Sequence, residues 1–303
     1  MTHDQRLQSA SRSLDGLSVG DAFGECFFSI SLSEMSLRMH LTSRTPPNHR
    51  WRWTDDTAMA VSIFEVLSRH GQIDQDELAE TFAKRYAWDD RRGYGGTAHG
   101  ILRSIGSGGS WADISPTVLG GTGSMGNGAA MRVAPLGVYF AHNTRGLVEQ
   151  ARRSAEITHA HPEGQAGAIA VALAAGFIAS HPMSCATEIR EEFFEYIISH
   201  VPDSQTRALV KQAGELPAEF AVETAASVLG NGSRITAPDT VPFCLWCAQK
   251  SLGSFEDAMW LTVEAGGDMD TNCAIVGGIV AAEPRGMPPA EWLTRREPLP
   301  TPL

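Results

Sequence analysis

The chain contains little cysteine, little positive charge and no long uninterrupted apolar segment. Its 5 cysteines in 303 residues are too few and too scattered for a disulfide framework, which favours a reducing compartment, with the cytoplasm as the expected location. The formal net charge of -11 argues against general nucleic-acid binding, because such proteins need a basic surface. The stretch from Ala166 to Ala179 is the nearest to a membrane span, but it is short and rich in alanine and glycine, so no membrane partner is expected.

Alternation of apolar and polar residues with period two, the pattern of a half-buried strand, is nearly absent. Apolar residues recur instead at helical spacing, and this predicts helices over much of the chain, among them Leu7 to Phe28, Thr57 to His70, Pro162 to Ser180 and Thr271 to Ala282. No linker or repeat divides the sequence, so the predicted fold is all-α, a single-domain orthogonal helical bundle over residues 1–303 with long ligand-binding loops. The proline-rich stretch from Arg296 to Leu303 is expected to be extended.

Two clusters of oxygen-bearing side chains each stand just before an apolar helical pattern. Their members are Thr54, Asp55 and Asp56 in the first cluster, and Asp268, Asp270 and Thr271 in the second. Helix capping explains either cluster alone, because Asp and Thr are favoured at helix starts. The two together favour a metal site, since Mg²⁺ and Mn²⁺ prefer carboxylate, hydroxyl and water oxygens. Two helix starts that face each other could hold two ions, as in two-metal hydrolytic sites.

Glycine and serine dominate residues 106–129, and a loop of that length is uncommon in a compact domain unless it has a function. Within it, the segment from Gly120 to Gly128 exposes backbone N–H groups and permits close approach of a phosphate. It lacks the Lys-Ser/Thr ending of a P-loop, and no predicted strand precedes it, so neither common nucleotide fingerprint applies. Judged alone, this stretch is equally well explained as a flexible surface loop.

Two further motifs carry candidate chemistry. His159 and His161 lie beside an expected helix start, where two histidines could bind a transition metal, but a third soft ligand is missing. A histidine that hydrogen-bonds to or stacks on a ligand is therefore favoured, with a capping or surface histidine as the alternative. Cys244 and Cys247 form a lone CxxC pair within an apolar helical pattern, and we interpret them as core cysteines.

Seven motifs follow one another along nearly the whole chain. They are Gly20-Asp21-Ala22-Phe23-Gly24, Trp53-Thr54-Asp55-Asp56-Thr57, Arg92-Gly93-Tyr94-Gly95-Gly96, Gly126-Asn127-Gly128-Ala129-Ala130-Met131-Arg132, Thr158-His159, Gly230-Asn231-Gly232 with Val241-Pro242, and Gly267-Asp268-Met269-Asp270-Thr271-Asn272. In this order they make the chain resemble the ADP-ribosylglycohydrolase family. Each motif is weak by itself, but the ordered set is highly specific.

The resemblance implies an all-helical hydrolase with a binuclear centre of two Mg²⁺ or Mn²⁺ ions, acting on the ADP-ribose moiety of an ADP-ribosylated protein. It places the first oxygen cluster on one side of the metal pair and the second cluster on the other. It also implies that the glycine loop holds the distal ribose and the diphosphate. The implied substrate-binding residues are Gly95, Gly96, Gly123, Ser124, Met125, Gly126, Asn127, His159 and Ile235, with Ile235 near the adenine.

One position departs from the family pattern. Family members commonly carry a glutamate about four residues after the last glycine of the first motif, where this chain has Phe28, whereas Glu25 directly follows Gly24. We expect the catalytic base to be Glu25 or one of the metal-binding aspartates. The candidate catalytic residues are therefore Glu25, Asp55, Asp56 and Asp270.

Asp90 precedes the glycine turn of the third motif and could meet a guanidinium leaving group, which favours arginine-linked ADP-ribose as the substrate. One alternative is a non-catalytic module that binds ADP-ribose or another protein. Others are a hydrolase of a serine or nucleobase linkage, and a Mg²⁺-dependent phosphohydrolase that attacks the diphosphate. Nucleic acid is expected only as a modified substrate.

Overall fold

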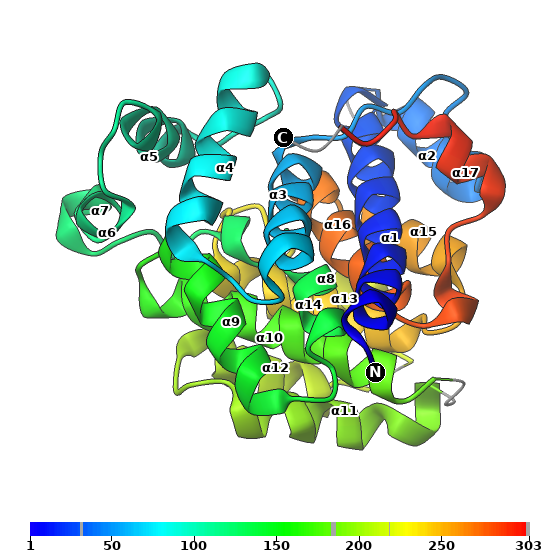
Figure 1. Ribbon diagram of the computed structural model, residues 1–303. Helices are drawn as coiled ribbons and strands as arrows, with labels where there is room; N and C mark the ends of the chain where they lie inside the picture. Colours follow the sequence, from blue (N-terminus) through cyan, green and yellow to red (C-terminus); the bar gives the residue numbers. More distant parts are fainter. Residues whose placement is uncertain (31–32, 183–185, 218, 301–303) are drawn as a thin grey trace.

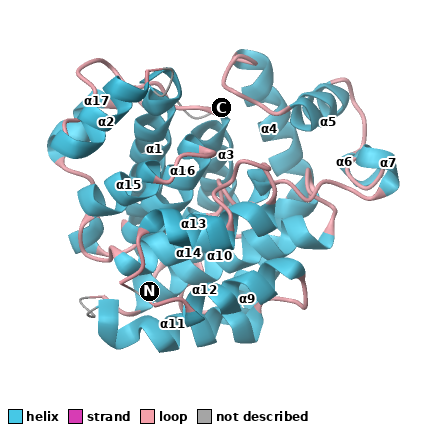
Figure 2. Ribbon diagram, turned by 180° about the vertical axis from the view of Figure 1, so that it is seen from behind, coloured by secondary structure: helices cyan, strands magenta, loops and turns pink. Residues whose placement is uncertain are grey.

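The computed structural model describes residues 1–30, 33–182, 186–217 and 219–300, and within these ranges it contains helices and two isolated bridges but no strand (Figures 1 and 2). The all-α prediction is confirmed. The helices in chain order are α1 (His3–Ile30), α2 (Glu34–Ser43), α3 (Asp55–His70), α4 (Gln75–Trp88), α5 (Gly96–Gly106), α6 (Trp111–Ile114), α7 (Val118–Gly121), the 3-10 turn η1 (Asn127–Ala129), α8 (Ala134–Tyr139), α9 (Thr144–Glu156), α10 (Pro162–Ser180), α11 (Ala186–His200), α12 (Gln205–Glu215), α13 (Val222–Leu229), α14 (Ala237–Lys250), α15 (Phe255–Glu264), α16 (Met269–Val280), the 3-10 turn η2 (Pro284–Gly286) and α17 (Ala290–Arg295).

Helices α1 and α16 form the most extensive helix pair of the fold, although they come from opposite ends of the chain (Figure 1). Glycines four residues apart on α1 lie on one helix face and let the two backbones approach closely. A Cβ atom at Gly20 would lie 2.1 Å from the carbonyl oxygen of Cys273, and one at Gly24 would lie 2.2 Å from that of Met269. The first motif of the sequence is therefore packed directly against the last one.

Helix α10 lies in the lower layer together with α9, α11 and α12 (Figure 1). Among the described residues it is the one helix long and apolar enough to cross a membrane, but 78% of its apolar window is buried within the fold. Its alanines and glycines allow other helices to approach, and Gly167 would bring a Cβ to 2.6 Å from the Cβ of Ala237 on α14. Its apolar character is thus explained by a central place in the core.

Most predicted helix boundaries hold within a few residues. Helix α10 spans the predicted range, and α3 begins at Asp55 rather than at Thr57 because Thr54 provides the cap. The prediction of one long loop over residues 106–129 is wrong, because the stretch contains the short helical turns α6, α7 and η1. Left-handed backbone at Leu119 interrupts α7 and prevents a longer helix. The tail is irregular from Arg296 to Pro300, and the rest of the predicted extended stretch lies outside the described residues.

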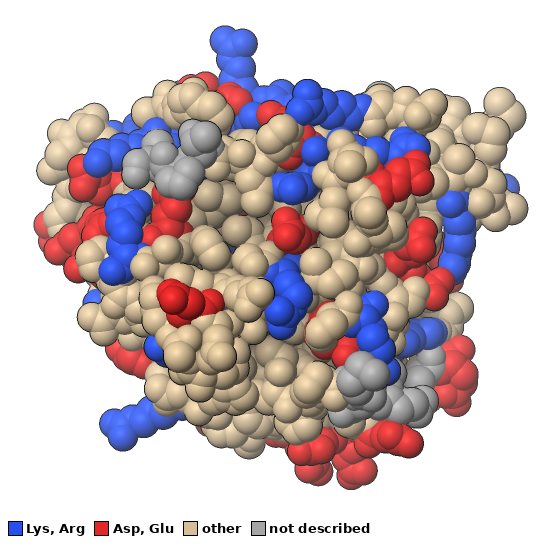
Figure 3. Space-filling model, turned by 45° about the vertical axis from the view of Figure 1, so that its right-hand side comes forward, with Lys and Arg blue, Asp and Glu red and all other residues tan. Residues whose placement is uncertain are grey.

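Charged side chains are unevenly spread over the surface. In the view of Figure 3, lysine and arginine side chains gather along the upper edge, and many aspartate and glutamate side chains lie at the lower right. The net charge of -11 therefore does not describe every part of the surface. An overall acidic protein of this kind can still attract an anionic ligand locally.

The close contact between α1 and α16 predicts that one added methyl group on α1 will lower the stability of the fold. We expect Gly20→Ala to destabilise the fold by about 3 kcal/mol or more, because the new Cβ would lie 2.1 Å from the carbonyl oxygen of Cys273 on α16. The control is Gly100→Ala on α5, where no atom lies within 4 Å and alanine should stabilise the helix by up to about 1 kcal/mol. Urea unfolding measures both, and equal stabilities of Gly20→Ala and the wild-type protein would contradict the close packing.

Candidate active site

Most of the predicted site residues line one cavity of about 390 Å³. Segments far apart in the sequence meet there, from α3, the turn before α5, the glycine loop, the loop before α10, the loop before α14 and the start of α16. The predicted residues that line it are Asp55, Asp56, Gly95, Gly96, Ser124, Met125, Gly126, Asn127, His159, Ile235, Asp268, Asp270 and Thr271. The two oxygen clusters therefore do face a common space, together with the glycine loop.

Asp21 of α1 holds the start of α3 in place. It is fully buried, and its Oδ2 atom accepts hydrogen bonds from the backbone N–H groups of Thr54 at 2.9 Å and Thr57 at 3.1 Å. The hydroxyl of Thr57 donates to the same oxygen. Burial raises the pKa of Asp21 to about 6, and these hydrogen bonds oppose that rise. Sequence reasoning missed Asp21 as a site residue, although an aspartate on the apolar face of a predicted helix is an available signal.

The start of α16 is fixed by a second turn. Gly267 has φ of 74°, and a Cβ at this position would lie 2.0 Å from the carbonyl oxygen of Asn231. The same carbonyl accepts hydrogen bonds from the backbone N–H of Asp268 at 3.2 Å and from Nδ2 of Asn272 at 2.8 Å. The motif around Asn231 therefore supports the motif from Gly267 to Asn272, and it fixes the backbone at Asp268.

The aspartates at the two helix starts carry strongly perturbed acidity. Burial raises the pKa of Asp55 to about 8, and the negative charges of Asp21 and Asp268 add to the effect. Burial also raises the pKa of Asp56, with the charge of Asp270 as the next cause. The pKa of Asp270 is raised by burial and by the charge of Asp268. Several carboxylates are therefore gathered in a buried environment that disfavours even one negative charge. Such an arrangement is typical of a cation site.

The donor atoms suit a hard divalent cation. The Oδ2 atom of Asp56 is buried and accepts no hydrogen bond from the described residues. No three carboxylate, imidazole or thiol groups within the described ranges are arranged as a ready-made metal site. Coordination would therefore need oxygens from both helix starts, from hydroxyls and from water, a mixture that Mg²⁺ accepts. The buried cysteines Cys244 and Cys273 are neutral thiols, since burial raises the pKa of both.

The glycine loop is tied to both the second oxygen cluster and the loop before α14. The side-chain amide of Asn127 donates to Oδ2 of Asp268 at 2.7 Å and to the hydroxyl of Thr240 at 3.0 Å. Its backbone N–H donates to the carbonyl of Ile235 at 3.3 Å. Asn127 therefore positions the loop relative to the aspartates.

Two apolar side chains stand exposed among the residues that line the cavity. Leu119 is 59% exposed with φ of 52°, and Ile235 is 63% exposed with φ of 54°. Left-handed backbone is uncommon for a leucine and costly for a β-branched isoleucine, and such conformations cluster at ligand sites. Leu119 was not predicted, because nothing in the sequence shows that α7 breaks at this residue.

Hydrogen bonds hold the ring of His159 in place. Buried Arg132 donates to the hydroxyl oxygen of Thr158 at 2.9 Å, and that hydroxyl lies 2.7 Å from Nδ1 of His159. Burial lowers the pKa of His159 to about 3, and the positive charge of Arg132 acts in the same direction. The imidazole is therefore neutral, and it lies beside the backbone of Gly126 and Gly128.

Four predicted residues do not line the cavity. Thr54 caps α3, and its hydroxyl also donates to Oδ1 of Asp56 at 3.3 Å, so the capping interpretation applies to it. Gly123 packs against the backbone of His161 with φ of 72°. Asp90 is exposed and lies 3.8 Å from a guanidinium nitrogen of Arg103. Their roles in binding metal or substrate stay predictions.

Glu25 is the fourth predicted residue that does not line the cavity, and it lies half-buried on α1. Burial raises its pKa, and the positive charge of Arg52 opposes that shift. It follows Asp21 by one helical turn, so it lies on the same face of α1, next to the segment that leads into α3. Its assignment as the base stays a prediction.

Comparison with known proteins identifies the family of this chain. The family model of ADP-ribosylglycohydrolase matches residues 2–297. Human ADP-ribosylhydrolase ARH3 is 28% identical over 89% of this chain and 83% of its own length. ADP-ribosylarginine hydrolase Tri1 of Serratia proteamaculans is 24% identical over 92% of this chain and 72% of its own length. A solved ADP-ribosylglycohydrolase-related protein complex superposes with a TM-score of 0.66 at 25% identity, covering 97% of this chain and 94% of that one. Because the family model spans nearly the whole sequence, the chain belongs to the ADP-ribosylglycohydrolase family.

Proposed function

We propose that the protein hydrolyses the glycosidic bond between ADP-ribose and a side chain of a modified protein, with arginine as the favoured side chain, and releases ADP-ribose. The observation that carries this proposal is the single cavity in which two aspartate clusters face a glycine-rich loop. The aspartates suit cations and a ribose, and the loop suits a diphosphate. A ligand that combines these groups is ADP-ribose.

Two divalent cations, Mg²⁺ or Mn²⁺, are the proposed cofactors. The residues that would hold them are Thr54, Asp55, Asp56, Asp268, Asp270 and Thr271. When bound, such ions orient ribose hydroxyls and make a nearby water more acidic. The repulsion among the aspartates and the unpartnered oxygen of Asp56 support this assignment.

The remaining residues would orient the substrate. The N–H groups of Gly126 and Asn127 already donate to Ser124 and Ile235, so the loop would serve the diphosphate by letting it approach the backbone closely. The neutral His159 has its Nε2 atom beside this loop, where it can form a hydrogen bond with a ligand. Leu119 and Ile235 offer apolar surface for the adenine ring.

The reacting bond would lie at the aspartates. Cleavage of a glycosidic bond develops positive charge at the anomeric carbon, and nearby carboxylates stabilise that charge. Glu25 or one of the aspartates Asp55, Asp56 and Asp270 would take the proton of the attacking water. The arginine preference is supported by the name of the Serratia relative, an ADP-ribosylarginine hydrolase. A serine or nucleobase linkage, and binding without cleavage, remain the alternatives to be tested.

The metal assignment predicts the effect of neutralising two aspartates. We expect Asp56→Asn and Asp270→Asn each to lower the hydrolysis rate by at least about 100-fold and to weaken Mg²⁺ binding, because each removes a charged ligand. Activity assays and calorimetric titration of the metal measure these effects. The exposed Asp113 on α6 provides the control Asp113→Asn, which should behave as the wild-type protein. Full Mg²⁺-dependent activity in Asp56→Asn would contradict the assignment.

The reaction type predicts the products. With Mg²⁺ or Mn²⁺ present, we expect free ADP-ribose from an arginine-linked substrate and a lower rate with serine- or nucleobase-linked substrates, and we expect no reaction with a chelator. Chromatography identifies the products. AMP with ribose phosphate would instead indicate attack on the diphosphate, and tight ADP-ribose binding without any product would indicate a non-catalytic module.

The buried neutral His159 predicts a dependence of stability on pH. Its pKa is about 3 in the fold and about 6.5 in the unfolded chain, so the unfolded chain binds the proton more readily. The contribution of His159 to stability is complete above pH 6.5 and is lost as the pH falls towards 3. Between pH 6 and 4 the free energy of unfolding should therefore change more steeply in the wild-type protein than in His159→Asn, by up to about 1.4 kcal/mol per pH unit. Urea unfolding at several pH values tests this, and equal slopes would refute it.

A further inference from the structure

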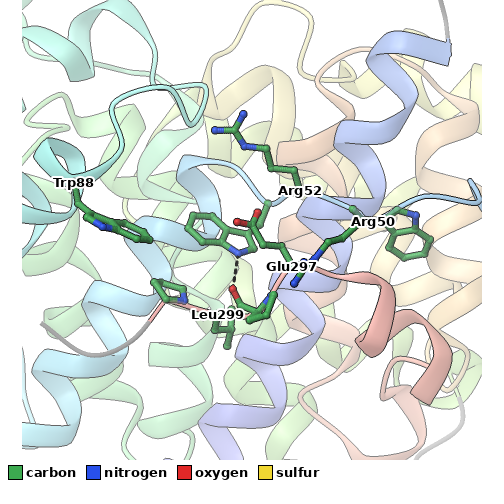
Figure 4. Close-up of a pocket in the computed structure, with 9 residues that line it drawn as sticks. Arg50, Arg52, Trp88, Glu297 and Leu299 are labelled. Atoms are coloured by element: carbon green, nitrogen blue, oxygen red, sulfur yellow. Dashed lines mark hydrogen bonds between the residues drawn. The ribbon is translucent and has the colours of Figure 1, made fainter.

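The C-terminal tail runs beside the segment that leads into the first oxygen cluster. The backbone N–H of Trp51 donates to the carbonyl of Arg295 at 2.9 Å, and the N–H of Glu297 donates to the carbonyl of Trp51 at 2.8 Å. These two bonds form a parallel bridge. Beyond it, Nε1 of Trp53 donates to the carbonyl of Pro298 at 3.1 Å, as the dashed line in Figure 4 shows.

Glu297 lies at the centre of this contact (Figure 4). Its carboxylate accepts two hydrogen bonds from the guanidinium of Arg92, at 2.8 Å and 2.9 Å. This two-pronged geometry is the strongest form of an arginine–carboxylate pair. Arg92 is buried, so loss of the carboxylate would leave a buried cation with the shared Asp89 as its remaining acidic partner.

Arg92 in turn holds the backbone that carries the oxygen cluster. Its guanidinium lies 3.6 Å above the ring of Trp53 and donates to the carbonyl of that residue at 3.0 Å. Its own carbonyl accepts a hydrogen bond from the N–H of Asp55 at 2.7 Å. The path from the tail to the cluster therefore has two steps, from Glu297 to Arg92 and from Arg92 to Trp53 and Asp55.

The contact between the C-terminal tail and the segment before α3 has a physical purpose. Negative charges on the aspartates of the two helix starts disfavour one another, so contacts that fix these segments help to keep the carboxylates together. Asp21 provides one such support from α1, through the backbone of Thr54 and Thr57. The tail contact adds a second support, since it holds Trp51 and Trp53 just before α3.

We propose that Glu297 is a positioning residue for the metal-binding segment, and that the tail from Arg296 to Pro300 clamps this segment through Arg92. The clamp keeps Asp55 and Asp56 in place in the metal-free protein, so that cations meet a preformed cluster. This inference rests on the proposed function in one respect, that these aspartates bind the cations.

The experiment compares Glu297→Ala with the matched variant Glu291→Ala. Glu291 belongs to the same C-terminal region and pairs with Arg295, but it makes no contact with Arg92. Mn²⁺ binding is measured by electron paramagnetic resonance, and hydrogen exchange of the Asp55 amide is measured in the metal-free protein. We expect Glu297→Ala to weaken Mn²⁺ binding by about 10-fold and to speed exchange at Asp55, and Glu291→Ala to change neither.

The conservative variant Glu297→Gln separates positioning from a loss of folding. It keeps an oxygen for Arg92 but not the charge, so we expect it to lie between the wild-type protein and Glu297→Ala in Mn²⁺ affinity and in exchange. Wild-type exchange at Asp55 in both Glu297 variants, or an equal effect of Glu291→Ala, would overturn the proposal. A wild-type protein that binds no Mn²⁺ would overturn the proposed function instead, and the exchange measurement would still decide whether the clamp exists.

Discussion

Repulsion among four aspartates is the main constraint on this structure, and other parts of the fold counteract it. Asp55 and Asp56 start α3, and Asp268 and Asp270 stand at the start of α16. Burial makes the ionised forms of Asp55, Asp56 and Asp270 less favourable, and the charges of neighbouring carboxylates add to that cost. The cluster persists because several unrelated contacts fix the two helix starts. Divalent cations would then convert a destabilising set of charges into a binding site.

The close contact of α1 and α16 is the foundation of these supports. Glycines on α1 bring its backbone against that of α16, and Asp21, on the same helix, reaches the start of α3. One helix therefore fixes the relative position of both oxygen clusters. The glycine loop joins the arrangement through Asn127, which donates directly to Asp268. The second oxygen cluster and the glycine loop are therefore parts of one hydrogen-bonded unit, so a substitution in one should change the geometry of the other.

Sequence reasoning reached the fold class from local patterns, and it reached most of the cavity residues through the ordered motifs that the chain shares with its family. Helical spacing of apolar residues identified α1, α3, α10 and α16, because a buried helix face imposes its period on the sequence. Oxygen-bearing side chains at helix starts identified the two clusters. Among the residues it missed, Asp21 acts through contacts with the start of α3, and Leu119 has a left-handed backbone that no local pattern records. Glu25 was chosen by its position in a motif, and its neighbour Arg52 is visible only in three dimensions.

The sequence by itself determined the elements of this protein: its helices, its two oxygen clusters, its glycine loop and the ordered motifs of its family. Each of these is a matter of residue type and spacing along the chain. The tertiary structure decided which of them meet. Capping and metal binding look the same in the sequence, because both place Asp and Thr at a helix start. They differ once two starts face each other, since only then do like charges accumulate. The buried Oδ2 atom of Asp56 then has no hydrogen-bond partner in the described part of the chain.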